Sequence, residues 1–221
     1  MGVIICFSFS TITDVHYLAD KYKVKVAKAS YDLLSADQPE GLKTIVYPNS
    51  YANALIKMSK GYAFCPMRYR LRPFNSENEI PSKYNLYNAR LEGILEKKVW
   101  APLIARKHVA IPVTRFHEWV PTDKGKKIAQ FYMPENEIFW IAGLYDIWKG
   151  SKPGEQIVSF ALITQPPNDY IREVGHDRCP LIITESEARN WVATVSPDDA
   201  MHLLKKRREY HFSHQWSDPV S

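Results

Sequence analysis

Four residues spread along the 221-residue chain have the side chains that covalent chemistry by a thiol needs. Cys6 offers an attacking sulfur, and Asn88 offers an amide that can orient a substrate. Glu118 and His176 are groups that can carry protons during such a reaction. Together these four residues predict a catalytic site, provided that the fold brings them close to one another.

Each of the four residues also has an ordinary structural interpretation. Cys6 lies in an apolar run, and free cysteines are among the most buried residues. Asn88 begins an Asn-Ala-Arg tripeptide that is equally typical of a turn, and His176 can form a local ion pair. Glu118 either faces water from an edge strand or lies on an apolar face, where its pKa would be raised.

A second group of residues has the composition of a nucleic-acid-binding surface. Arg68 and Arg70 belong to the segment 67–74, in which basic and aromatic residues alternate. Such a segment suits single-stranded DNA, because the cations bind phosphates and the aromatic rings stack on bases. A second basic cluster at 205–208 follows a predicted helix, where its ordinary role is to complement the helix dipole.

The composition is that of a globular protein, with 45% hydrophobic and 24% charged residues and a net charge of +5. The mild basic excess is compatible with a nucleic acid partner. Three cysteines, an odd number at no metal-like spacing, indicate reduced thiols in a cytoplasmic protein. No apolar run reaches the roughly 18 residues of a membrane span, and no membrane partner is expected. His211 and His214 lack partnering ligands, so we expect no metal and no cofactor.

The first half of the chain is predicted to contain a strand, a helix and a long loop. Apolar β-branched and aromatic residues predict a strand over 3–9, and Asp14 then starts a short amphipathic helix. The pattern is extended from Thr44 to Phe64. Residues 68–83 are polar and irregular, which predicts the longest loop of the chain.

The second half is dominated by predicted strands. Short apolar or alternating runs occupy 108–113, 115–120, 128–133, 138–145 and 157–164, separated by turn residues. A capping box at Thr184 and Glu187, and the sequence Ser196-Pro197, then start two helices. We therefore expect one α+β domain over residues 1–221, with a β-rich curved sheet or pseudo-barrel and peripheral helices.

The ordered set of motifs resembles the SOS-response-associated peptidase (SRAP) family, which includes abasic-site-processing proteins. The matching elements are Cys6-x-x-Phe9, Gly61-Tyr62-Ala63, Asn88-Ala89-Arg90-x-Glu92, Phe116-x-Glu118-Trp119, Ile163-Thr164, His176-Asp177-Arg178-x-Pro180-Leu181 and Trp216-x-x-Pro219-Val220-Ser221. They follow the family's order over nearly the whole chain.

The resemblance implies a pseudo-barrel with a positively charged groove for single-stranded DNA that contains abasic sites. In that family an N-terminal cysteine captures the ring-opened sugar as a thiazolidine, which leaves a DNA–protein crosslink. By position, Cys6 is the implied nucleophile, Asn88 orients the sugar, and Glu118 and His176 handle protons. By position, Arg90 and Thr164 are the implied DNA-binding residues. Together with them we predict that Arg68, Arg70 and Arg178 bind DNA.

Two departures from the family pattern affect this expectation. Five residues, Met1 to Ile5, precede Cys6, so its α-amine lies in a peptide bond until they are removed, for example by autoproteolysis. Ser8 replaces the family's arginine two places after the cysteine. Two alternatives follow: a binding module that holds single-stranded DNA without a covalent bond, or a cysteine hydrolase that uses Cys6 and His176.

Overall fold

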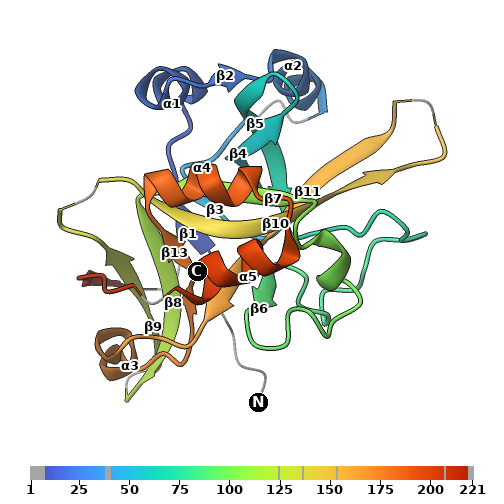
Figure 1. Cartoon of the computed structure of the whole chain (residues 1–221). Coiled ribbons are helices and arrows are strands. Elements are labelled where there is room, and N and C mark those ends of the chain that lie inside the picture. Colours follow the sequence, from blue (N-terminus) through green and yellow to red (C-terminus); the bar gives the residue numbers. More distant parts are fainter. Residues whose placement is uncertain are drawn as a thin grey trace.

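Strands dominate the structure, as the regularly spaced apolar runs predict (Figure 1). The computed structural model describes residues 8–37, 41–123, 125–135, 137–152, 154–206 and 208–218. The strands are β1 Ser8–Ser10, β2 Lys25–Val26, β3 Ile45–Val46, β4 Tyr51–Met58, β5 Gly61–Tyr69, β6 Asn88–Arg90, β7 His108–Val113, β8 Arg115–Thr122, β9 Gly125–Tyr132, β10 Phe139–Lys149, β11 Gln156–Gln165, β12 Cys179–Pro180, β13 Ile182–Ile183 and β14 Ser213–Ser217. The helices are α1 Val15–Tyr22, α2 Lys28–Asp37, α3 Asp169–Val174, α4 Glu185–Ala193 and α5 Pro197–Lys205, with a 3₁₀ turn, η1, at Ala101–Leu103.

Five strands close into a barrel. The order β11-β10-β7-β4-β5 is antiparallel throughout, and β5 then pairs in parallel with β11, which completes the ring. At this closing seam Arg68 lies opposite Ser159 and Tyr69 lies opposite Phe160. Further along β11, the short strand β6 pairs in parallel, with Asn88 opposite Leu162. The predicted pseudo-barrel is therefore confirmed, and its seam lies on the strand that also carries Thr164.

A second, five-stranded sheet packs against the barrel in the order β14-β9-β8-β1-β3. Its first strand, β1, pairs with β8 so that Ser8 lies opposite His117 and Phe9 opposite Phe116. On the other side β1 pairs with β3, which makes it an internal strand of this sheet. The part of the chain that follows Cys6 is thereby held beside the strand that carries Glu118.

Both faces of the barrel strands are buried, because their side chains alternate between two apolar clusters. One cluster joins the barrel to aromatic residues of the second sheet, including Phe9, Phe116 and Phe131. The other lies beneath the helices and includes Trp191 of α4 and Leu204 of α5. Each fully buried large apolar side chain contributes about 1.5–3 kcal/mol relative to an exposed one. These clusters therefore give the strands beneath the site a rigid support.

The predicted helix starts are confirmed. Asp14 caps α1 by accepting hydrogen bonds from the backbone N–H groups of His16 and Tyr17. Thr184 and Glu187 form the complete capping box of α4, and Ser196 caps α5. After α5, Arg208 donates to the carbonyl of Leu203 and to the carboxylate of Glu187. The basic cluster at 205–208 therefore has the helix-terminal role predicted for it, except Arg207, which lies outside the described residues.

The structure also differs from the sequence-based expectation in several places. The irregular segment begins two residues later than predicted, because Arg68 and Tyr69 complete β5 through their pairing with β11. The predicted strand over 3–9 is confirmed only for Ser8 and Phe9, because residues 1–7 lie outside the described residues. The helices α2 and α3 and the strand β14 were not predicted.

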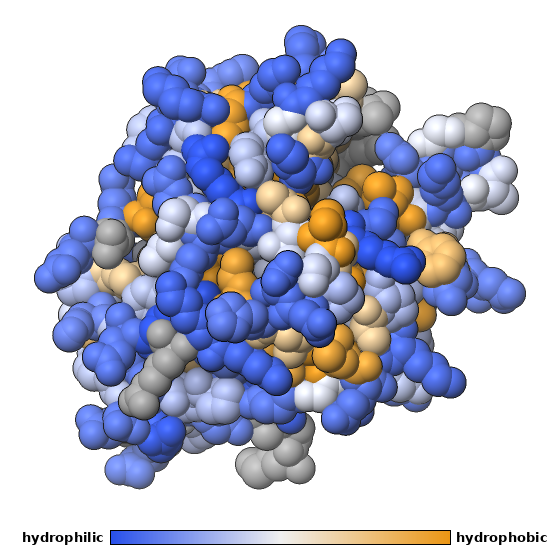
Figure 2. All heavy atoms as spheres, viewed as in Figure 1, coloured by the Kyte–Doolittle hydropathy of each residue, from blue (hydrophilic) through white to orange (hydrophobic). Residues whose placement is uncertain are grey.

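The face of the molecule seen in Figure 2 is mainly hydrophilic, with apolar residues in small separate groups. Within the described ranges, no helix is long and apolar enough to cross a membrane.

Candidate functional site

Glu118 and His176 form a buried pair at the centre of the candidate site. The Glu118 side chain on β8 is fully buried, and one of its carboxylate oxygens lies 3.1 Å from Nε2 of His176. On the same strand Phe116 and Val120 are also buried, which confirms the face predicted from alternation. The alternative of an edge-strand glutamate facing water is wrong, whereas the predicted rise of the pKa of Glu118 stays a prediction.

The contacts of His176 orient its ring so that Nε2 faces Glu118. Nδ1 of His176 lies 2.9 Å from the carbonyl oxygen of Arg178, which can only accept, so Nδ1 carries a hydrogen. A longer contact of 3.4 Å from the backbone N–H of Arg178 to the same nitrogen is the weaker competitor. Nε2 faces the carboxyl group of Glu118 at 3.1 Å, which is within hydrogen-bond distance. The two side chains are therefore placed so that a proton can pass between them.

A helix end directs His176 toward β8. Asn168 caps α3 at its start, and Gly175 ends the helix in the left-handed conformation, with φ of +107°. A Cβ atom at Gly175 would lie only 2.9 Å from Cγ1 of Val120. Because both the conformation and the close approach require glycine, Gly175 sets the distance between His176 and the strand of Glu118.

Arg178 joins three elements of the site. Its guanidinium donates two parallel hydrogen bonds to Glu92, at 2.8 and 2.9 Å, and a third to the hydroxyl of Thr164 at 3.1 Å. Burial favours the neutral form of Glu92, but the hydrogen bonds from Arg178 outweigh it and lower the pKa of this carboxyl. Glu92 belongs to a matching sequence motif, but sequence analysis gave it no role. Arg178 and Thr164 are therefore brought together.

Asn88 and Arg90 lie on β6, beside the same strand, β11. Arg90 is opposite Thr164, two residues beyond the pairing of Asn88 with Leu162. Asn88 is buried, whereas Arg90 is exposed. The Asn-Ala-Arg tripeptide is therefore a strand, and its interpretation as a turn is wrong. The exposed guanidinium of Arg90 can reach a phosphate at the surface, while the Asn88 amide points to a more enclosed position.

Cys6 lies outside the described residues, but its nearest described neighbour, Ser8, is firmly held. His117 is sandwiched between the hydroxyls of Ser8 and Ser10, at 3.1 and 3.0 Å from its two ring nitrogens. Burial, assisted by the charge of Arg115, lowers the pKa of His117 to about 4, so the ring is neutral at neutral pH. A neutral ring donates to one hydroxyl and accepts from the other. His117 thus fixes β1 beside β8, a role that sequence analysis missed.

The two cysteines that the structure describes are not activated thiols. Cys65 and Cys179 are free and buried. Burial raises the pKa of Cys65, and burial together with the nearby Glu118 carboxylate raises the pKa of Cys179 to about 12. Both thiols are therefore protonated at neutral pH, and a protonated thiol is a poor nucleophile. Cys6 stays the candidate nucleophile.

The remaining predicted residues, Arg68 and Arg70, lie at the barrel seam and in the loop that follows it. Both side chains are buried to about nine-tenths and face the carboxylate of Glu79. Among the described residues there is no group of three or more metal-binding side chains, and His214 instead contacts the hydroxyl of Tyr170 at 2.8 Å.

A closed barrel packed against a sheet whose strand β8 carries Glu118, buried against His176, defines a class of protein, and sequence comparison agrees with it. The chain belongs to the SOS response associated peptidase (SRAP) family, whose profile matches residues 5–220.

Several members of this family are similar to the chain. The abasic site processing protein YoaM of Bacillus subtilis is 29% identical over 162 residues, which cover 72% of this chain and 70% of YoaM. YoqW from the same organism is 30% identical over 55% of each chain. The abasic site processing protein HMCES of Gallus gallus is 26% identical over 66% of this chain and 50% of HMCES. The chain thus spans about half the length of YoqW and of HMCES.

Solved structures share the fold. A crystal structure of a Bacteroides thetaiotaomicron protein has a TM-score of 0.78 at 22% identity and covers 96% of this chain and 91% of its own. A Bordetella bronchiseptica protein has a TM-score of 0.77 at 17% identity and covers 97% and 100%. At these identities the likeness concerns the fold alone.

Proposed function

We propose that this protein processes abasic sites by binding single-stranded DNA and forming a covalent crosslink through Cys6. The observation that carries the proposal is the buried Glu118–His176 pair beside β1. One residue separates Cys6 from Ser8, so chain connectivity alone keeps their Cα atoms within about 7 Å. Membership of the family and the names of its similar members support the choice of substrate.

The proposed reaction begins with hydrolysis of the Ile5–Cys6 peptide bond, which frees the α-amine of Cys6. An α-amine has a pKa of about 8, so a useful fraction is neutral at physiological pH. Its nitrogen attacks the aldehyde carbon of the ring-opened abasic sugar, and loss of water gives an imine. The Cys6 sulfur then adds to the imine carbon while its proton passes to the nitrogen, which closes a thiazolidine and completes the crosslink.

The described residues have distinct proposed roles in this reaction. Glu118 and His176 donate a proton to the leaving water and accept the one released by the thiol. Asn88 orients the sugar through its amide, and Arg90 and Thr164 bind the DNA. Arg178 stays a predicted DNA ligand, and its pairing with Glu92 means that a phosphate has to compete with that carboxylate.

The peptidase activity in the family's name fits the first step. We propose that Cys6 and His176 also cleave the Ile5–Cys6 bond, so that the chain removes its own first five residues.

The described cysteines are free thiols, which supports a reducing compartment such as the cytoplasm.

The test is incubation with single-stranded DNA that carries one abasic site, followed by a denaturing gel. We expect a band that survives denaturation with a chain starting at Cys6, and with the full chain only after cleavage, which mass spectrometry detects. A chain starting with alanine in place of Cys6 keeps the amine but lacks the sulfur. It should give an adduct only after borohydride reduction, which traps the imine.

The alternative function is a binding module without covalent chemistry, which is favoured by the five residues that precede Cys6. It predicts binding of single-stranded DNA that is indifferent to Cys6→Ala. If the chain starting at Cys6 binds abasic DNA but forms no adduct, even after reduction, the crosslinking proposal is wrong and the binding module takes its place.

A further inference from the structure

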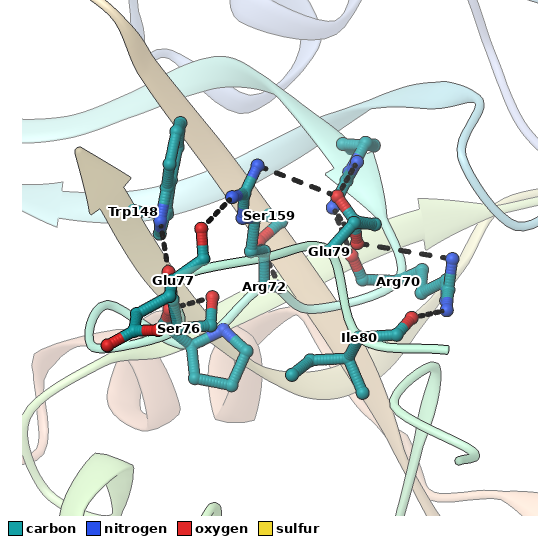
Figure 3. Close-up of polar contacts among 10 residues, drawn as sticks. Arg70, Arg72, Ser76, Glu77, Glu79, Ile80, Trp148 and Ser159 are labelled. Atoms are coloured by element: carbon teal, nitrogen blue, oxygen red, sulfur yellow. Dashed lines mark hydrogen bonds and ion pairs between the residues drawn. The ribbon is translucent and has the colours of Figure 1, made fainter. Parts of the chain in front are cut away.

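Three arginines, Arg68 near the end of β5 and two more in the loop that follows it, surround the carboxylate of Glu79 (Figure 3). Arg68 donates two hydrogen bonds to the two oxygens of Glu79, at 3.0 and 3.1 Å. The guanidinium of Arg72 lies 3.7 Å from one of these oxygens and that of Arg70 lies 4.0 Å from the other. Three positive charges thus converge on one negative charge.

The arginines are built into the fold, whereas Glu79 is not. Their side chains are only 9–11% exposed, compared with 40% for Glu79. The guanidinium of Arg72 stacks on Trp148 of β10, with Cζ 3.3 Å from the centre of the ring. The backbone N–H of Arg72 donates to the hydroxyl of Ser159 on β11. Holding such side chains against the protein with an incomplete set of counter-charges is costly. The arrangement therefore resembles an anion site more than a structural ion pair.

Arg70 shows the same feature in its backbone. Its φ of +102° lies in the region that favours glycine, so an arginine here costs about 1–3 kcal/mol. In this conformation the guanidinium of Arg70 faces Glu79 and donates to the carbonyl oxygen of Ile80. The strained conformation keeps a third positive charge in the cluster.

The first part of the loop has attachments that do not involve Glu79. Phe74 donates its backbone N–H to Asp146, and Trp148 donates to the carbonyl of Ser76, so the first part of the loop is fixed to β10. Beyond this anchor, residues 77–84 are exposed except Ile80, which is half-buried. The contacts of Glu79 and Ile80 with the arginines hold this exposed segment down.

The position of the cluster relates it to the candidate site. Arg68 lies opposite Ser159 on β11, and Asn88 and Arg90 lie opposite Leu162 and Thr164 on the same strand. At about 3.3 Å per residue, the cluster is roughly 10 Å along the strand from the level of Asn88 and 17 Å from that of Arg90. A single strand of a few nucleotides can span this interval.

We propose that Arg68, Arg70 and Arg72 bind one backbone phosphate of single-stranded DNA, and that Glu79 occupies this phosphate site in the free protein. A carboxylate and a phosphate present oxygens to a guanidinium fork in the same way. DNA therefore has to displace Glu79 and the segment 77–84, which lowers its apparent affinity. The inference rests on the DNA binding proposed above but not on the covalent step.

The experiment measures binding of unmodified oligothymidylate by fluorescence anisotropy at fixed ionic strength. Glu79→Gln keeps the volume and removes the competing charge, and we expect about tenfold tighter binding. Glu77→Gln is the matched control, because Glu77 lies in the same loop but its carboxylate does not contact the arginines; it should change affinity by less than about twofold. Equal gains for both variants would mean that only the net charge matters, and would overturn the proposal.

A double-mutant cycle with Arg70→Gly tests the mechanism. Glycine accepts the positive φ, so this variant removes the guanidinium without added backbone strain. In the Arg70→Gly background the gain from Glu79→Gln should be clearly smaller than tenfold, because one of the three guanidinium groups that face Glu79 is gone. An undiminished tenfold gain would show that Glu79 does not act through the arginine site.

Inorganic phosphate distinguishes the source of the anion. In Glu79→Gln, phosphate should compete with the oligonucleotide more strongly than it does in the wild type. Phosphate binding without any change in DNA affinity would assign the site to a free anion and overturn the DNA assignment. If neither protein binds oligothymidylate, the DNA-binding proposal itself fails, together with this inference.

Discussion

At the scale of single residues, the main finding is that Glu118 and His176 are buried in contact with each other. Their 3.1 Å contact places a carboxyl group and an imidazole within hydrogen-bond distance. A thiazolidine needs a proton delivered when water leaves and another taken when the thiol adds. A pair that shares one proton can carry out both proton transfers more readily than a single glutamate on an apolar strand face.

Glu118→Gln should therefore slow crosslinking by about 10²-fold or more, the usual contribution of a general acid–base group. His176→Ala should have a similar effect, and the double variant should be no slower than either single one, because the residues share one task. The measurement is the rate of adduct formation at saturating abasic DNA. A gel-shift with intact DNA serves as the control and should be unchanged; multiplicative losses in the double variant would contradict a shared proton.

At the scale of elements, the end of α3 sets the geometry of the pair. Gly175 stops the helix in a left-handed conformation, directly against Val120, and His176 follows at once. Two residues after His176, directly before β12, Arg178 then contacts Thr164 and Glu92. The site is thus assembled from the ends of several elements, each stopped at a defined residue.

Gly175→Ala should destabilise the protein by about 1–3 kcal/mol and also slow crosslinking, because the new methyl group meets Val120 at 2.9 Å. Gly61→Ala is the matched control: its φ is +120°, but nothing lies within 4 Å of the added Cβ. It should lose stability and keep its crosslinking rate. Urea unfolding and the adduct assay measure the two effects. If Val120→Ala fails to restore the rate of Gly175→Ala, the close contact is not the cause.

At the scale of the whole molecule, buried histidines connect the sheets to the rest of the structure. His117 bridges Ser8 and Ser10 of β1, while His108 of β7 stacks on Trp191 of α4 at 3.6 Å. Burial lowers the pKa of each to about 4. The folded protein therefore keeps both rings neutral under conditions in which an unfolded chain would protonate them.

The sign of the resulting pH dependence follows from linkage. The folded pKa of about 4 lies below the unfolded value of 6.5, so stability is complete above pH 6.5 and is lost as the pH falls toward 4. Between pH 7.5 and 5 each histidine should cost about 2 kcal/mol of unfolding free energy. Urea titrations at both pH values measure this loss. His117→Gln, whose amide can serve both serines, should lose about 2 kcal/mol less; an unchanged loss would contradict the assignment.

Much of the fold could be predicted from local patterns. The strands β7 to β11 and the capped starts of α1, α4 and α5 follow from alternation and from capping residues, which act within a few positions along the chain. The helix α3 and the strand β14 were missed, because α3 has only six residues and β14 exists through its pairing with β9. Likewise, Arg68 and Tyr69 are strand residues only because β11 lies beside them.

The sequence by itself determined the types and order of the chemical groups, since the motifs around Asn88, Glu118 and His176 are local. Only the tertiary structure decided which groups meet: that Glu118 is buried against His176, that Arg178 is held by Glu92, and that three arginines share Glu79. The physical reason is that burial and ion pairing depend on partners far apart along the chain, such as Glu92 and Arg178, which are 86 positions apart. Barrel closure brings such partners together, and no local pattern encodes it.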